Sequence, residues 1–154
     1  MKTQPKSITI MIADDDADDR MMIADAFKEN RLANDVRFVE NGVELMDYLF
    51  HRGKFTDAEK NPRPGLILLD LNMPKMDGRE ALAEIKADPS LRSVPVVVLT
   101  TSKAEEDIFR TYELGVNSYI TKPVTFNSLV TLTKELGRYW FEIVELPHEE
   151  RQLS

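Results

Sequence analysis

Five polar residues stand at the ends of short apolar runs that have the composition of β-strands. They are Asp14 and Asp15 after the first run, Asp70 at the end of the third, Thr100 after the fourth and Lys122 just beyond the fifth. In a doubly wound parallel sheet, ligands bind beyond the carboxyl ends of the strands, where the strand order reverses. We therefore expect three carboxylates, one hydroxyl and one amine to converge at one edge of a sheet.

These groups together have the parts of a phosphoryl acceptor. Carboxylates brought close together repel one another unless they take up protons or a cation settles among them. A cluster of oxygen ligands suits Mg²⁺, a hard ion that works with phosphates. A carboxylate beside such an ion can attack phosphorus. The ion and a lysine can neutralise the phosphoryl oxygens, and the hydroxyl of Thr100 can donate a hydrogen bond to one of them.

The elements that must position these residues alternate between strand and helix. Strands are predicted at residues 8–13, 36–39, 66–70, 96–99 and 117–120, and helices at residues 21–27, 41–50, 78–88, 103–114 and 125–137. The strands are continuous Val, Ile and Leu runs, which indicates burial on both faces and a parallel sheet. The pattern predicts an α/β fold with a doubly wound, five-stranded parallel sheet and helices on both faces.

Helical spacing also predicts which side chains face the core. In the first helix, Met21 and Met22 are expected in the core or on a helix face, together with Ile23, Ala26 and Phe27. In the second helix, the residues expected to be buried are Val43, Leu45, Met46, Leu49 and Phe50. In the third they are Ala81, Leu82 and Ile85.

Composition narrows the class of protein. The formal charge is −7, which argues against nonspecific binding to nucleic acid. The absence of cysteine excludes disulfides and thiolate metal sites, and His51 and His148 are too far apart for a zinc motif, so both are taken as surface residues. The sequence has neither an apolar run of the roughly 20 residues that a membrane helix needs nor the pattern of a signal peptide. We expect a cytoplasmic protein of one domain.

Two segments stand outside the repeating pattern. Residues 51–65 are polar, contain proline and glycine, and predict a long surface loop. The tail, residues 139–154, includes Trp140 and Phe141 and comes after the fifth strand–helix unit, when the core should be complete. An apolar segment that the chain's own core does not need favours a dimer interface. The alternative is that the tail packs on the chain's own core. The predicted division is a domain over residues 1–138 and an extension over residues 139–154.

Four motifs in the sequence closely resemble those of receiver domains of two-component response regulators. They are DDD at residues 14–16, LILLDLNMPKMDG at 66–78, PVVVLT at 95–100 and YITKP at 119–123. The resemblance runs from about residue 8 to residue 137. It implies a flavodoxin-like fold with strand order 2-1-3-4-5 and makes Asp70 the phosphoryl acceptor. It also implies Mg²⁺ ligands, which are Asp14, Asp15, Asp70 and the backbone carbonyl of Asn72.

The resemblance implies a switch as well as a site. Thr100 and Lys122 would contact the phosphoryl group, and Tyr119 would turn inward as Thr100 moves towards the phosphate. The output face would be the fourth helix, the fifth strand and the fifth helix. The protein would catalyse its own phosphorylation and slow hydrolysis without being an enzyme for an outside substrate.

A narrower likeness concerns the partner. The inserted loop, the runs at residues 100–102 and 122–124, and the tail look like those of single-domain regulators paired with phytochrome-type histidine kinases. The expected partners are such a sensor kinase and a second copy of the chain, bound through the last helix and tail. Residues 138–154 are too few for a helix-turn-helix domain, so direct control of transcription is not expected.

Two other functions are weighed against the switch. A phosphohydrolase of the haloacid-dehalogenase type would use Asp14 as its nucleophile, but this leaves the Asp70 motif and Lys122 unexplained. A pure interaction module would have lost phosphorylation, although the acceptor and its neighbours are all present. Singly, each residue has a plainer explanation, such as an acidic turn with Asp16 capping a helix; the combination favours the switch.

Overall fold

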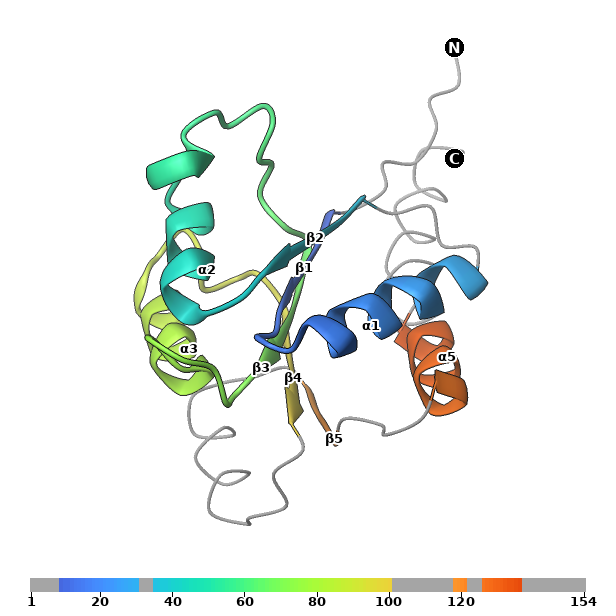
Figure 1. Cartoon of the computed structure of the whole chain (residues 1–154). Coiled ribbons are helices and arrows are strands. Elements are labelled where there is room, and N and C mark those ends of the chain that lie inside the picture. Colours follow the sequence, from blue (N-terminus) through green and yellow to red (C-terminus); the bar gives the residue numbers. More distant parts are fainter. Residues whose placement is uncertain (1–8, 31–34, 101–117, 122–125, 137–154) are drawn as a thin grey trace, which may run out of the picture.

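The computed structural model describes residues 9–30, 35–100, 118–121 and 126–136 (Figure 1). Its strands are β1 (Thr9–Ala13), β2 (Asp35–Val39), β3 (Leu66–Asp70), β4 (Val96–Thr100) and β5 (Ser118–Thr121). Its helices are α1 (Ala17–Glu29), α2 (Gly42–Leu49), α3 (Gly78–Ala87) and α5 (Phe126–Leu136), with a short 3₁₀ helix, η1 (Gly53–Phe55), after α2. The predicted helix over residues 103–114 lies outside the described residues. No helix in the described ranges is long and apolar enough to cross a membrane.

The strands form one sheet in the order β2-β1-β3-β4-β5. Every neighbouring pair is parallel, which confirms the predicted doubly wound topology. The chain moves outward from β1 to β2 and then returns past β1 to β3, so the strand order reverses between β1 and β3. That is the point at which sheets of this kind bind ligands.

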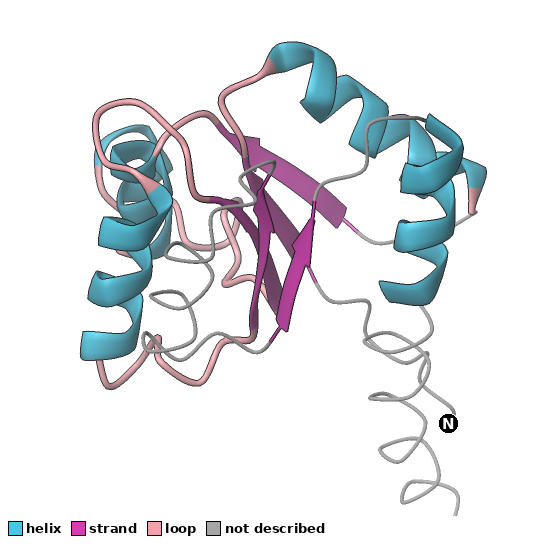
Figure 2. Cartoon of the chain, turned by 90° about the horizontal axis from the view of Figure 1, so that it is seen from below, coloured by secondary structure: helices cyan, strands magenta, loops and turns pink. Residues whose placement is uncertain are grey.

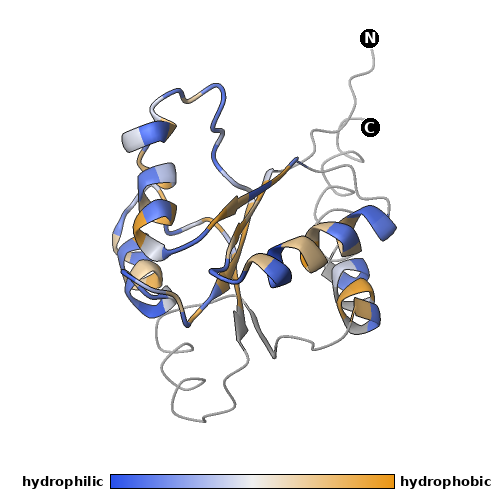
Figure 3. Cartoon of the chain, in the orientation of Figure 1, coloured by the Kyte–Doolittle hydropathy of each residue, from blue (hydrophilic) through white to orange (hydrophobic). Residues whose placement is uncertain are grey.

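Helices cover both faces of the sheet, and alternate strand residues feed two separate cores (Figures 1 and 2). In β3, Ile67 and Leu69 join the core under α2 and α3, whereas Leu66 and Leu68 join the core under α1 and α5. In Figure 3, β1 and β3 are largely hydrophobic, whereas the helices carry both hydrophilic and hydrophobic residues. Burial on both faces explains the continuous apolar runs that predicted a parallel sheet.

Two core positions predicted in α2 are wrong, for geometric reasons. The inward face of α2 is formed by Leu45, Met46 and Leu49, whereas Val43 and Phe50 are exposed. They lie seven residues apart, about two helical turns, and Phe50 comes after the last helical residue. In α1 the buried side is Ile23, Ala26 and Phe27, which leaves Met21 on the opposite side and 67% exposed.

Residues 51–65 form the predicted surface loop, which contains η1 and contacts α2. Phe55 of η1 packs edge-on against Tyr48 with ring centroids 5.1 Å apart, and the Tyr48 hydroxyl donates a hydrogen bond to the Pro62 carbonyl at 2.7 Å. Burial raises the pKa of Tyr48, which keeps this donor protonated. His51, expected to be an ordinary surface residue, places Nε2 2.8 Å from the Asn61 carbonyl oxygen. The segment is therefore fastened to α2.

Two glycines hold the segment that connects β3 to α3. The Gly42 N–H donates to the Met76 carbonyl at 2.8 Å and the Gly78 N–H to the Leu71 carbonyl at 2.9 Å. A Cβ at Gly42 would overlap the Met76 carbonyl oxygen, and one at Gly78 would overlap the carbonyl of Asp70. The segment after Asp70 is thus held against the first residues of two helices.

Replacing Gly78 by alanine is expected to destabilise the fold by about 1–3 kcal/mol, the usual effect of forcing extra atoms into a packed site. Helix propensity alone predicts the opposite sign, because alanine is favoured over glycine by roughly 1 kcal/mol within a helix. Urea unfolding followed by circular dichroism measures the difference. Glu84→Ala, an exposed change in the same helix, is the control and should stay within about 0.5 kcal/mol. A Gly78→Ala protein as stable as wild type would contradict the close approach.

Candidate functional site

Three carboxylates meet where the strand order reverses. Asp14 and Asp15 directly follow β1, and Asp70 is the last residue of β3. Because Ala13 of β1 is paired with Leu69 of β3, Asp14 and Asp70 occupy the next position on neighbouring strands. One oxygen from each of the three carboxylates lies within 4.8 Å of the others. Asp14 is 1% and Asp70 8% exposed, whereas Asp15 is exposed.

The two buried carboxylates are oriented by the same local device. Oδ1 of Asp14 accepts the N–H of Asp16 at 2.9 Å, and Oδ1 of Asp70 accepts the N–H of Asn72 at 2.9 Å. This turn, in which an aspartate side chain bonds the backbone two residues on, is a preferred local geometry of Asp and Asn. It fixes the rotation of each carboxylate and so sets the direction of its second oxygen.

Arg20 also borders the cluster, and sequence reasoning did not single it out. Its Nη1 donates a hydrogen bond to the Asp14 carbonyl oxygen at 2.8 Å, and its Nη2 lies 3.7 Å from Oε2 of Glu40. The carbonyl contact depends on how α1 leaves β1, which no residue pattern shows. The turns in which Asp14 and Asp70 accept the backbone N–H two residues on could, in contrast, have been expected, because aspartate prefers such turns.

The remaining predicted residues are only partly described. Thr100 ends β4, one residue beyond Leu99, which is paired with Asp70, and Tyr119 of β5 is paired with Val98. Their backbones thus lie at or near the edge that carries the acidic cluster. The side chains of Thr100 and Tyr119, and the whole of Lys122, lie outside the described part of the chain. The predicted roles of these three residues stay predictions.

The donor set fits a hard divalent cation. All three side-chain ligands are carboxylates, the class that Mg²⁺, Ca²⁺ and Mn²⁺ prefer. Two oxygens bound to one such ion, each about 2.0–2.6 Å from it, lie no more than about 4–5 Å apart, which matches the size of the cluster. Burial of two like charges side by side also favours an opposite charge among them.

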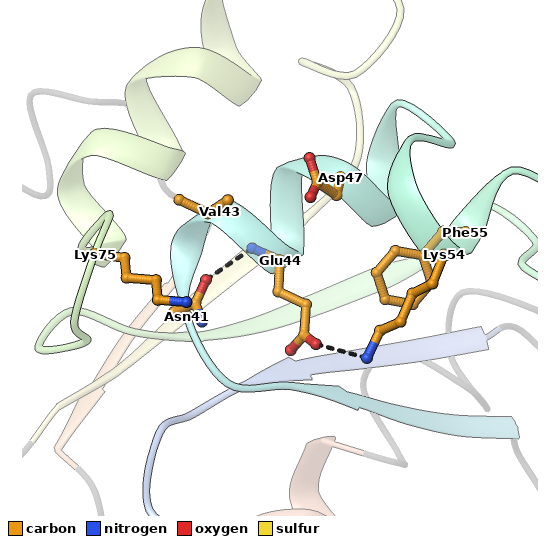
Figure 4. Close-up of a pocket in the computed structure, with 7 residues that line it drawn as sticks. All are labelled: Asn41, Val43, Glu44, Asp47, Lys54, Phe55 and Lys75. Atoms are coloured by element: carbon orange, nitrogen blue, oxygen red, sulfur yellow. Dashed lines mark hydrogen bonds and ion pairs between the residues drawn. The ribbon is translucent and has the colours of Figure 1, made fainter.

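A separate pocket of about 300 Å³ lies beside α2 (Figure 4). It is lined by Asn41, Val43, Glu44, Asp47, Lys54, Phe55 and Lys75, so it includes none of the three clustered carboxylates. Glu44 pairs with Lys54 at 3.0 Å and Asp47 with Arg52 at 3.2 Å. Its charges are largely paired already, and we assign it no chemistry.

The sequence and the fold match known proteins along nearly the whole chain. A family model described as the response regulator receiver domain matches residues 10–134. The chain is 40% identical over 146 residues to the response regulator Rcp1 of Synechocystis sp. (strain ATCC 27184 / PCC 6803 / Kazusa), covering 95% of this chain and 97% of Rcp1.

Two solved structures of similar proteins share the fold. The phosphorylated cyanobacterial phytochrome response regulator RcpA has a TM-score of 0.81 and 44% identity, covering 88% of this chain and 94% of that one. The Mn²⁺-bound form of Rcp1 has a TM-score of 0.79 and 39% identity, covering 88% and 95%. Both the receiver motifs and the narrower likeness to phytochrome response regulators are thereby confirmed. The chain belongs to the family of response regulator receiver domains.

Proposed function

We propose that the chain is a phosphorylation-dependent signalling switch in which Asp70 accepts a phosphoryl group from a sensor histidine kinase. The observation that carries the proposal is the cluster of Asp14, Asp15 and Asp70 at the point where the strand order reverses. The phosphorylated state in which the similar protein RcpA was solved supports it. In the step itself, a carboxylate oxygen of Asp70 bonds to phosphorus as the bond from phosphorus to the donor breaks, giving an acyl phosphate.

In this proposal the cluster holds Mg²⁺ through Asp14, Asp15, Asp70 and the backbone carbonyl of Asn72. The Mn²⁺-bound structure of the similar protein Rcp1 supports binding of a divalent cation, and the all-oxygen donor set suits Mg²⁺. When bound, the ion neutralises charge on the phosphoryl oxygens. The Asn72 N–H meanwhile holds one oxygen of Asp70 in place.

The switch would act through charge. The acyl phosphate carries roughly −1.5 to −2 charges in place of the single charge of Asp70, and the proposal has Thr100 and Lys122 move to contact it, with Tyr119 turning inward. A local charge would then bias the packing of the proposed output face, which consists of β5, α5 and the helix predicted over residues 103–114. The only reactions catalysed are the chain's own phosphorylation and slow hydrolysis.

Two partners are proposed, one from the similarity to known response regulators and one from the apolar tail. The similarity to phytochrome response regulators favours a phytochrome-type kinase as the donor. In the proposed arrangement residues 1–138 form the receiver domain, with the insertion at residues 51–65, and residues 139–154 join α5 in a homodimer interface. Phe126 of α5 is an exposed aromatic side chain, which supports a place for this helix in the interface. The proposed setting is the cytoplasm, with no role for nucleic acid or a membrane.

Incubation with acetyl phosphate tests the acceptor. Intact-mass spectrometry is expected to show one added phosphate on wild type, dependent on Mg²⁺, and none on Asp70→Asn, which lacks the nucleophilic carboxylate. An adduct that persists on Asp70→Asn would move the nucleophile elsewhere, with Asp14 the first candidate. If wild type takes no phosphate from this small donor, the same experiment with a purified histidine kinase decides between a donor-selective receiver and a vestigial site.

Loss of one ligand tests the metal site. Asp14→Asn should weaken Mg²⁺ affinity by at least about tenfold, since even outer-shell changes at metal sites cost that much. Titration calorimetry measures the dissociation constant. Asp25→Asn, which removes an exposed charge from the same part of the chain, is the matched control and should leave it nearly unchanged. An equal loss of Mg²⁺ affinity in both variants would mean that net charge, and not a ligand role of Asp14, explains the effect.

Removal of residues 139–154 tests the proposed interface. The shortened chain should be a monomer by multi-angle light scattering at concentrations where the full chain is a dimer, because the apolar tail supplies buried contact area. Circular dichroism establishes that the shortened chain is folded. A dimer that survives the truncation would place the interface elsewhere.

A further inference from the structure

Arg20 contacts the acidic site from a neighbouring element. It lies in the first turns of α1, and its side chain is 19% exposed. Its Nη1 donates to the carbonyl oxygen of Asp14 at 2.8 Å. The guanidinium therefore touches the backbone of a clustered residue and is not simply a solvated charge beside the site.

This contact completes the fixation of Asp14. The Asp14 N–H donates to the Val39 carbonyl at 3.0 Å, and Oδ1 accepts the Asp16 N–H. The hydrogen bond from Arg20 to the Asp14 carbonyl oxygen is a third restraint. It acts on the peptide group that joins Asp14 to Asp15. Backbone position, side-chain rotation and the following peptide plane are thus all held at one residue, which is 1% exposed.

Arg20 is itself held by the loop between β2 and α2. Its Nη2 lies 3.7 Å from Oε2 of Glu40, and the Glu40 N–H donates to Oε1 of Glu44 at 2.7 Å. A planar guanidinium can reach two acceptors at once, which the single ammonium of lysine does less well. Arg20 therefore joins the end of β1 to the segment after β2.

The positive charge of Arg20, taken alone, would weaken metal binding. A positive charge close to a site for Mg²⁺ opposes binding of the ion, because like charges repel. If Arg20 acted through its charge alone, its removal would tighten metal binding. A role in holding Asp14 predicts the opposite sign, so the two explanations are separable by experiment.

We propose that Arg20 is a positioning residue for the metal site: by holding the Asp14 carbonyl, it keeps the buried carboxylate turned towards Asp15 and Asp70. The inference rests on the proposed function in so far as it takes the acidic cluster to bind a divalent cation.

The experiment measures Mn²⁺ affinity of the full chain by titration calorimetry. Arg20→Gln is expected to raise the dissociation constant roughly tenfold, the lower end of the range for outer-shell changes. Arg37→Gln makes the same change in net charge at an arginine that pairs with Asp35 and the Lys60 carbonyl instead, and should stay within about twofold because distant surface charges are screened. Arg20→Lys keeps the charge and a donor, and should bind more tightly than Arg20→Gln.

A second readout separates positioning from general damage. With acetyl phosphate as donor, the metal concentration for half-maximal phosphorylation should rise in Arg20→Gln, while the rate at saturating metal stays within about twofold of wild type, because saturation offsets an outer-shell defect. A misfolded or globally loosened protein would lose the saturating rate. The lysine variant keeps the test open if the glutamine variant does not fold.

The outcomes are distinct. Unchanged or tighter Mn²⁺ binding by Arg20→Gln overturns the inference while the proposed function stands. An Arg20→Lys protein no better than Arg20→Gln also overturns it. A wild-type chain that binds no Mn²⁺ removes the metal site itself, and both the metal part of the proposed function and this inference fail together.

Discussion

Mutual repulsion among carboxylates at the ends of β1 and β3 is the constraint on which the rest of the molecule depends. Two of them are almost fully buried, and like charges held this close disfavour the compact state. The fold offsets the repulsion in part by aiming backbone N–H groups at them, from Asp16 and Asn72. It keeps them together because they end or directly follow β1 and β3, two strands that are buried on both faces and cannot move apart without disrupting two cores.

The architecture was readable from the sequence because this burial has a direct signature. Strands that contact helices on both faces must be apolar at every position, so β1, β3 and β4 were recognisable without knowledge of their neighbours. Helix faces were less certain where the element is short. In α3 the buried Ala81, Leu82 and Ile85 were predicted correctly, whereas in α2 apolar Val43 and Phe50 face outward. An apolar side chain is tolerated at the surface, so hydrophobicity alone could not tell which ones the sheet would cover.

The site, too, has features that the sequence predicts and features that it does not. The meeting of Asp14, Asp15 and Asp70 was predictable because the carboxyl ends of parallel strands share an edge. What holds those residues was not predictable: Gly42 and Gly78 accept the close approach of the segment after Asp70, and Arg20 reaches back from the next helix. These contacts depend on distances between elements, which periodicity does not contain. The fastening of residues 51–65 by Tyr48 was missed for the same reason.

Charge arithmetic shows why a metal ion alone would not complete the proposed switch. The cluster brings three negative charges together, and conversion of Asp70 to an acyl phosphate replaces one of them with roughly −1.5 to −2. A divalent cation supplies two positive charges, so the phosphorylated site would retain a net charge of about −1.5 to −2 in a partly buried place. The guanidinium of Arg20 is directed at a backbone carbonyl and at Glu40, which already offset it. A further cation near the phosphoryl oxygens would offset this remaining charge, and the proposal assigns that role to Lys122, which follows β5 in the sequence. The site therefore has one charge before phosphorylation and another after it, and a local change in charge of this kind is what biases a switch.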